Sequence, residues 1–360
     1  MNILITNNEM DSYTGTTVYV KELAIALVKR GENVQIYTRY VGEIGLDIQR
    51  KGIMVTDSLR EITFMPDIIH THHNTTVFDV LFYFKNTPVI FWIHDRLTPL
   101  DFPPLHKNII RYLSVDYNCK ERYSADCGFD PSDSEVIYNW VNLERFTLRK
   151  KLNQEPKKAL VFSNYANNDN HLKSIQEACE QRGLQLDVIG KGTGNQKRDP
   201  EAYLMNYDII FAKAKAAMES LASGAGVIIC DYTGLAGFVT SDKLKHYRKY
   251  NFGMKLMDRL ITKEYIIEEI KKYDLDDIFK VSKTIRSEID MEKIINQIQS
   301  LYKDCITKYE KGDRGKYKFS LKNFLIIKIK TFYISNSQYL FYNFNSLFIF
   351  LHVIKKRLFP

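Results

Sequence analysis

The sequence predicts an α/β protein made of two Rossmann-like domains that face each other across a cleft. The chain has 360 residues, more than one hydrophobic core usually serves. Short apolar runs alternate with helical patterns, and the alternation restarts after a charged stretch at residues 148–158, which is typical of two parallel-sheet domains joined by a linker. The composition, 45% hydrophobic and 26% charged, excludes a wholly disordered chain and a polytopic membrane protein.

The first domain is predicted to span residues 1–147 and to open with a strand, a helix and a second strand. An apolar run at residues 3–5 is followed by apolar positions at helical spacing and, after Gly31, by a second run at residues 34–37. Continuous apolar runs of the kind found in a parallel sheet covered on both faces also lie at residues 68–70, 89–93 and 136–138.

The second domain is predicted to span residues 159–306, after the linker at residues 148–158. Helical patterns through Leu172 and through Met218 separate its apolar runs. Four or five strands are expected, among them residues 160–162, 186–189, 208–211 and 227–230. From residue 257 to about residue 309 the apolar residues keep a helical spacing, so helices are expected to close this domain.

Disulfide and metal support are not expected. The five cysteines are scattered, odd in number and form no C-x-x-C pair, which favours a reducing cytoplasm. The first residues lack the basic start and long apolar run of a secretory signal. His70 and His72 share one face of a predicted strand, next to His73, but no carboxylate or cysteine stands at ligand spacing. These histidines are therefore expected to pack or to line the cleft edge, with no metal.

The net charge of +8 is concentrated at the end of the chain. Residues 311–360 hold ten Lys and Arg against one Asp, so the remainder is close to neutral. Because the body carries no general excess of positive charge, nucleic-acid binding is not expected, whereas the tail suits an anionic surface.

A distinctive pattern lies at residues 211–235, FAKAKAAMESLASGAGVIICDYTGL. It reads as a strand, a short loop, a helix that carries Glu219 and small residues up to Gly224, a strand that ends at Asp231, and a Gly-containing turn. Three further segments precede it in a fixed order: the loop and helix from Thr14, residues 66–72, and residues 136–146. Together these segments resemble the family-4-like glycosyltransferases of the GT-B fold over residues 1–306.

The resemblance implies a retaining, metal-independent glycosyltransferase. It would move a sugar from a nucleotide-diphosphate sugar, its donor substrate, to a hydroxyl of a glycan or lipid-linked glycan in surface polysaccharide or glycolipid synthesis. No cofactor is expected, because fixed dipoles and cations in a closed cleft can stabilise a departing diphosphate.

The resemblance also assigns donor-binding residues. Glu219 would accept hydrogen bonds from the ribose hydroxyls, although a solvated Glu219 paired with Lys215 at i,i+4 spacing is the structural alternative. Lys213, Ala214 and Lys215 stand where the helix begins and its free N–H groups favour a diphosphate; alternatively the lysines point to solvent. The remaining donor-binding residues, from the first glycine loop, the segment after the linker and the Gly-containing turn, are Gly15, Lys173 and Gly234.

His94 is the candidate catalytic residue. It follows the apolar run at residues 89–93, where the resembled family often has a histidine that reaches towards the transferred sugar, and Asp95 is the neighbour that could orient it. A histidine that is only hydrogen-bonded within the fold is the alternative.

Two departures from the family pattern leave the donor sugar open. Phe211 stands where the family usually has a sugar-binding Glu, and residues 163–173 contain no Arg and only Lys173 where the family has Arg and Lys. A catalytically inactive scaffold or binding subunit therefore stays an alternative, as does a nucleotide-sugar 2-epimerase. The glycines at residues 190–194 lack the spacing of a phosphate-binding loop and are expected to form a flexible loop at the cleft rim.

The tail at residues 307–360 lies outside the resemblance. Spaced lysines stand among aromatic and aliphatic residues, and the charge-free stretch at residues 331–354 is interrupted by Asn, Ser and Gln. A spanning helix needs about 20 predominantly apolar residues, so a position on the anionic inner face of the cell membrane suits the tail better. The expected location is cytoplasmic and peripheral; packing of the tail on the body is the alternative.

Overall fold

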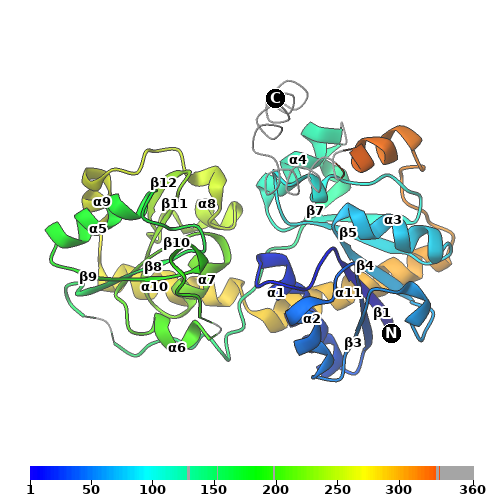
Figure 1. The fold of residues 1–360 in the computed structure, drawn as a ribbon, viewed down its shortest axis with the longest axis horizontal. Helices are drawn as coiled ribbons and strands as arrows, with labels where there is room; N and C mark the ends of the chain where they lie inside the picture. The colour runs from blue at the N-terminus through cyan, green and yellow to red at the C-terminus, as the bar shows by residue number, and fades with distance from the viewer. Residues whose placement is uncertain (128–129, 152, 198, 330–331, 333–360) are drawn as a thin grey trace. The chain divides into compact units, whose positions relative to one another are not determined.

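The structure, a computed structural model, describes residues 1–127, 130–151, 153–197, 199–329 and 332 (Figure 1). Contacts divide the chain into two compact units. Unit 1 consists of Met1–Ser114, Cys119–Glu135 and the chain from Gln299 onwards, and unit 2 consists of Val115–Asn118 and Val136–Ile298. The α/β class predicted from the sequence is confirmed, since each unit is built around its own sheet.

Unit 1 contains a seven-stranded sheet in the order β3-β2-β1-β4-β5-β6-β7. The pairings from β3 through β6 are parallel. The strands are β1 (Asn2–Asn7), β2 (Asn33–Thr38), β3 (Met54–Thr56), β4 (Ile68–His72), β5 (Val89–Ile93), β6 (Ile109–Ser114) and β7 (Ser134–Val136). The helices are α1 (Gly15–Lys29), α2 (Gly42–Gln49), α3 (Asn74–Tyr83) and α4 (Tyr117–Cys127). Strands β4 and β5 are buried along their whole length, as continuous apolar runs predict.

Unit 2 contains a five-stranded sheet in the order β12-β11-β10-β8-β9, parallel except for the β11–β12 pair. The strands are β8 (Lys158–Phe162), β9 (Gln185–Ile189), β10 (Ile209–Ala212), β11 (Gly226–Asp231) and β12 (Gly234–Phe238). The helices are α5 (Leu172–Gln181), α6 (Glu201–Leu204), α7 (Ala214–Ala222), α8 (Leu244–Lys249), α9 (Lys263–Ile270) and α10 (Leu275–Glu288).

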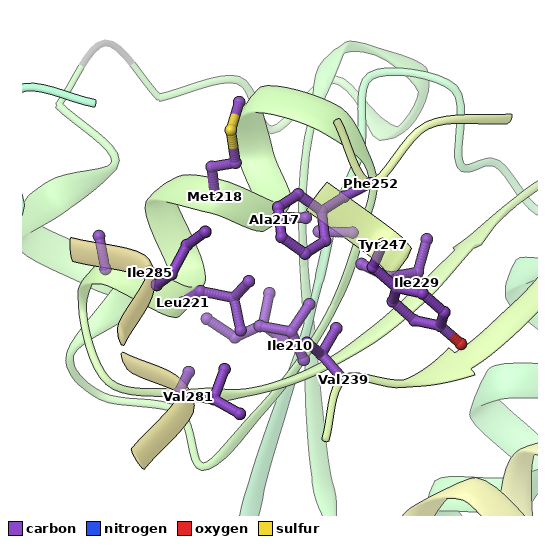
Figure 2. Packing of buried hydrophobic residues seen from close by; sticks show 14 of the residues in the cluster. Ile210, Ala217, Met218, Leu221, Ile229, Val239, Tyr247, Phe252, Val281 and Ile285 are labelled. Atoms are coloured by element: carbon purple, nitrogen blue, oxygen red, sulfur yellow. The ribbon is translucent and has the colours of Figure 1, made fainter. Parts of the chain in front are cut away.

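The pleat of β10 divides the core of unit 2 into two clusters. Ile210 packs with residues of α7 and α10 (Figure 2), whereas Ile209 and Phe211 pack on the other side with residues of α5 and α9. Successive strand residues point to opposite faces, so each face of this sheet has its own helical cover. Phe211 is buried in the second cluster. At this position the resembled family usually has a glutamate that binds the sugar.

The last long helix, α11 (Met291–Glu310), passes from unit 2 to unit 1. The predicted second domain extends to residue 306, but the part from Gln299 belongs to unit 1. Gln299 donates to Glu32 Oε1 over 2.7 Å, and the Tyr302 hydroxyl lies 2.5 Å from His70 Nδ1. Glu32 directly precedes β2 and His70 lies in β4, so both partners belong to unit 1, which explains the difference from the predicted boundary.

The chain after α11 continues along unit 1. The Tyr317 hydroxyl donates to Asp133 over 2.5 Å, and Asn323 Oδ1 accepts from the Leu105 N–H over 3.0 Å. For residues 307–329 these contacts favour the packed alternative over a tail separate from the body. The charge-free stretch predicted to lie on a membrane falls almost entirely outside the described residues. In the part of the chain that the structure describes, no helix is both long and apolar enough to cross a membrane.

Candidate functional site

The carboxyl ends of four parallel strands meet at one edge of the unit 2 sheet. In register, Phe162 of β8 pairs with Ile189 of β9, and Ala212 of β10 pairs with Ile229 of β11. Open α/β sheets bind ligands outside the carboxyl ends of their strands. The loops that follow these strands are therefore the candidate donor site.

The loops after β8 and β9 are tied together by their backbones. The Gly192 N–H donates to Asn164 O over 3.1 Å, and the Lys191 N–H donates to Asn164 Oδ1 over 3.1 Å. A Cβ atom at Gly190 would lie 1.9 Å from Ser163 O, and one at Gly192 would lie 2.3 Å from Ala166 O. These glycines permit the close approach of the two loop backbones, and the flexibility expected from the sequence stays a prediction.

Lys213 is held at this edge by three side chains. Its ammonium group forms an ion pair with Asp231 Oδ2 at the end of β11, and it lies over the rings of Tyr165 and Tyr232, 4.6 and 5.6 Å from their centroids. The Asp231 side chain is fully buried, and that of Lys213 is 18% exposed. The alternative that Lys213 points to solvent is therefore wrong, because its ammonium group forms a partly buried ion pair.

Helix α7 begins in an unusual way directly after Lys213. Ala214 has a positive φ of 49° and donates its N–H to Phe252 O over 2.8 Å. This backbone region costs a residue with a Cβ about 1–2 kcal/mol, and such strain gathers at functional sites. The N-cap residue is Lys213, whose ammonium group has no acceptor, and α7 has no capping hydrogen bond from this side chain.

Glu219 lies further along α7, with only 8% of its surface exposed. A solvated surface glutamate, the structural alternative, would be far more exposed than this. Its backbone carbonyl accepts from the N–H and the hydroxyl of Ser223, over 3.0 and 2.9 Å. The ribose contact of the Glu219 carboxylate stays a prediction.

His171 is a member of this edge that the sequence did not reveal as a site residue. It precedes α5, is 8% exposed, and its Nδ1 has no hydrogen-bond partner among the described residues. Burial lowers the pKa of His171, while the charge of Asp231 opposes that change. His171 is thus a neutral imidazole with an unpaired nitrogen, close enough to Lys213 and Asp231 to interact with their charges.

The other predicted donor residues are less closely gathered. Lys173 is an exposed residue of α5, and Lys215 is partly exposed in the first turn of α7. A Cβ at Gly234 would lie 2.9 Å from the carbonyl oxygens of Met257 and Arg259, so that glycine serves a close backbone approach. Gly15 belongs to unit 1, where it begins α1 beside open space.

In unit 1 the candidate His94 joins a buried group of rings at the end of β5. His94 Nε2 lies 2.8 Å from His72 Nδ1, and the ring of Tyr19 meets the His94 ring edge-on at 4.7 Å between centroids. Burial holds the pKa of His94 and His72 well below the usual histidine range. At neutral pH both rings are therefore uncharged, and one donates a hydrogen bond to the other.

Asp101, not Asp95, fixes the backbone that carries His94. Asp101 Oδ2 accepts from the N–H groups of His94 and Asp95, over 2.8 and 2.6 Å. The Asp95 carboxylate turns to its own loop and accepts from the N–H groups of Leu97 and Thr98, so the expectation that it orients His94 is wrong. Burial raises the pKa of Asp101 to about 7, against the effect of these two backbone hydrogen bonds.

Within the described residues, no group of three or more His, Cys, Asp or Glu side chains is arranged to hold a metal ion. His70 stacks on Trp92 at 4.8 Å between centroids and contacts Tyr302. The packing role expected for His70 and His72 agrees with these contacts.

Residues 13–145 match the sequence model of Glycosyltransferase Family 4. Several solved structures share the fold of the chain. The glycosyltransferase from Rickettsia africae ESF-5 has 12% identity and a TM-score of 0.59, covering 85% of this chain and 98% of that one. Anabaena HepE in complex with UDP and glucose has 11% identity and a TM-score of 0.58, covering 84% and 99%. The chain has the GT-B fold of these glycosyltransferases.

A further structure with this fold is WaaG, a glycosyltransferase involved in lipopolysaccharide biosynthesis, with 11% identity and a TM-score of 0.50, covering 84% of this chain and 99% of that one. No curated protein matches this chain in sequence. The family match covers the part of unit 1 that carries Gly15 and His94, whereas the donor-binding signature at residues 211–235 lies outside it. The resemblance recognised in the sequence is confirmed.

Proposed function

We propose that this protein is a glycosyltransferase that transfers a sugar from a nucleotide-diphosphate sugar to a hydroxyl of a glycan or lipid-linked glycan in surface polysaccharide or glycolipid synthesis. The observation that carries the proposal is the edge of the unit 2 sheet, where an uncapped helix start, a lysine and a buried Glu219 stand together. Support for the ligand class comes from HepE, whose structure holds UDP and glucose, and support for the acceptor class from WaaG.

The first turn of α7 is the part of the site suited to the diphosphate. N–H groups at a helix start carry partial positive charge and attract phosphate oxygens. Charge that builds up on the leaving diphosphate would be stabilised by these fixed dipoles, which need no reorganisation during the reaction. A metal ion is not required for this stabilisation, so we propose metal-independent transfer. Retention of the anomeric configuration is proposed from the family resemblance alone.

Lys213 and Asp231 would supply the second contact of the donor. A diphosphate placed on α7 would compete with Asp231 for the Lys213 ammonium group, and the carboxylate would be left to accept from a sugar hydroxyl. Tyr165 and Tyr232, both more than half exposed, offer ring faces to the apolar side of a sugar or to a base. This arrangement would take the place of the arginine that the chain lacks after β8.

His94 would act from unit 1 as a neutral hydrogen-bonding group towards the transferred sugar. Its low pKa means that it offers a donor or an acceptor without the cost of a buried charge. His72 holds one of its nitrogens, so the other nitrogen is the one available for substrate. The Asp101 carboxylate keeps the backbone of His94 in place during this contact.

The proposal is tested by donor binding and turnover. Glu219→Gln should weaken binding of the preferred donor among UDP-, GDP- and TDP-linked sugars by about 10- to 100-fold, because a charged hydrogen bond to hydroxyls contributes about 1.5–3 kcal/mol. Glu180→Gln on the exposed face of α5 is the matched control and should change nothing. Equal binding by Glu219→Gln and the parent would remove Glu219 from the site.

A binding subunit without activity is the second candidate, favoured by the burial of Phe211 in the core. Release of nucleotide diphosphate from the bound donor separates the two candidates. Donor binding without any release over long incubation would indicate the scaffold. Conversion of the donor to an isomer with the nucleotide still attached would indicate an epimerase, and either result would overturn the transferase proposal.

A further inference from the structure

The helix at residues 321–329, which follows α11, is anchored to unit 1 along one side. Asn323 and Ile327 are its buried residues. Asn323 Nδ2 donates to Pro103 O over 3.2 Å, and the ring of Phe324 meets that of Phe78 in α3 edge-on, 4.8 Å between centroids. The orientation of the helix is set by these contacts, so its opposite side faces away from the body.

The opposite side of this helix carries an exposed apolar stripe. Leu321, Leu325 and Ile329 are 62%, 48% and 60% exposed. They are spaced by four residues, which places them on one side of an α-helix. Phe332, which is also exposed, follows them in the chain. The fold of unit 1 therefore buries one side of the helix and leaves an equally apolar side in contact with solvent.

Phe82, at the end of α3, extends this stripe from a distant part of the sequence. Its ring lies 6.2 Å from that of Phe319 and 6.3 Å from that of Phe324. Phe82 and Phe319 are both exposed. We name the set formed by Phe82, Phe319, Leu321, Leu325, Ile329 and Phe332 the apolar face. Contiguous exposed apolar groups of this kind mark interaction sites, whereas single ones need no explanation.

The charged residues of the segment that carries the apolar face, apart from Phe82, have one sign. Residues 314–332 contain six Lys and Arg and no Asp or Glu. Lys318 and Lys322 are exposed, and the ammonium group of Lys328 lies 5.4 Å from the ring centre of Phe324. Aromatic and aliphatic groups bordered by lysines are the composition of interfacial membrane helices, whereas a second copy of the same face would bring like charges together.

We infer that the apolar face docks on an anionic lipid bilayer. Its side chains would enter the boundary between headgroups and acyl chains, and Lys318 and Lys322 would lie at the level of the lipid phosphates. The attraction follows from these residues alone. Its purpose rests on the proposed function, because a lipid-linked acceptor would be held in the same bilayer.

The experiment measures co-sedimentation of the full chain with phosphatidylcholine vesicles that contain or lack phosphatidylglycerol. We expect binding to the anionic vesicles only, with release at high salt. The variant Leu321→Gln/Leu325→Gln/Ile329→Gln should lower binding by at least about tenfold, since it removes the inserted apolar groups. The control Met65→Gln/Leu260→Gln changes two exposed apolar residues elsewhere and should bind like the parent.

Lys318→Gln/Lys322→Gln should weaken binding and flatten its salt dependence. We call Leu321→Gln/Leu325→Gln/Ile329→Gln the apolar-face variant. If it binds vesicles as well as the parent does, the inference is overturned, because another segment then binds the membrane. Loss of a dimer in that variant, with vesicle binding unchanged, would instead assign the face to a second copy. Donor binding in the same samples keeps the two proposals separate: Glu219→Gln should still bind vesicles, and the apolar-face variant should still bind donor.

Discussion

Breaking the Lys213–Asp231 pair should destabilise unit 2 unequally, depending on which partner is removed. Lys213→Met leaves the Asp231 carboxylate, whose side chain is fully buried, without its cation, and an uncompensated buried charge costs about 3–5 kcal/mol. Asp231→Asn leaves a lysine that keeps 18% exposure and two tyrosine faces. Its cost should be closer to about 1–3 kcal/mol.

The double variant Lys213→Met/Asp231→Asn should be more stable than Lys213→Met alone, because no unpaired charge is left. Urea unfolding measures these differences. The sequence contains two tryptophans, Trp92 in unit 1 and Trp140 in unit 2, so a Trp92→Phe background makes fluorescence report unit 2. If the two single costs add to within about 0.5 kcal/mol of the double variant, the pair has no coupling energy and the reasoning fails.

Four further substitutions have defined outcomes. Burial lowers the pKa of His73 to about 4, below the unfolded value, so its contribution to stability, about 3 kcal/mol, is lost as pH falls from about 6.5 towards 4. Burial raises the pKa of Asp101 in the folded protein to about 7, so its contribution to the free energy of unfolding increases as the pH falls over the same range. Asp101→Asn removes this compensation, so the free energy of unfolding should fall more steeply with falling pH. A pH series of urea curves measures this slope, and an unchanged slope would contradict the prediction. Gly192→Ala should lower the stability of unit 2 by about 1–3 kcal/mol, since its Cβ would meet Ala166 O, whereas Gly194→Ser, beside open space but at positive φ, should cost only about 1–2 kcal/mol. His94→Ala should lower turnover more than donor affinity, and an unaltered rate with the preferred donor would return His94 to a packing role.

The strands that could be predicted are those with continuous apolar runs, such as β5 and β11, because both faces of the sheet are covered. Strand β12 was missed since its sequence, GLAGF, is rich in glycine and it runs antiparallel at the sheet edge. Strand β3 is only three residues long. The predicted strand at residues 136–138 is wrong in its extent, because β7 is Ser134–Val136.

The candidate site could be predicted only where its residues are consecutive in sequence. Lys213 and Ala214 could be placed at the start of a helix, as α7 confirms, because a helix start has a recognisable pattern. The partners of Lys213 could not be found, since Tyr165 and Asp231 come from the ends of other strands and meet it only through the order of the sheet. Asp101 was missed for a related reason: its carboxylate bonds backbone N–H groups, and no side-chain pattern reports such a contact.

The passage of α11 into unit 1 has a consequence for synthesis on the ribosome. Unit 2 is completed by an almost continuous stretch that ends at Ile298, whereas unit 1 receives its part of α11 only from Gln299 onwards. The hydroxyl partner of His70 is therefore made 232 positions after it. Closing so long a loop is slow relative to local contacts, so we expect unit 1 to stay incomplete until unit 2 has emerged. A nascent chain halted before Gln299 should be cleaved by protease in unit 1 first.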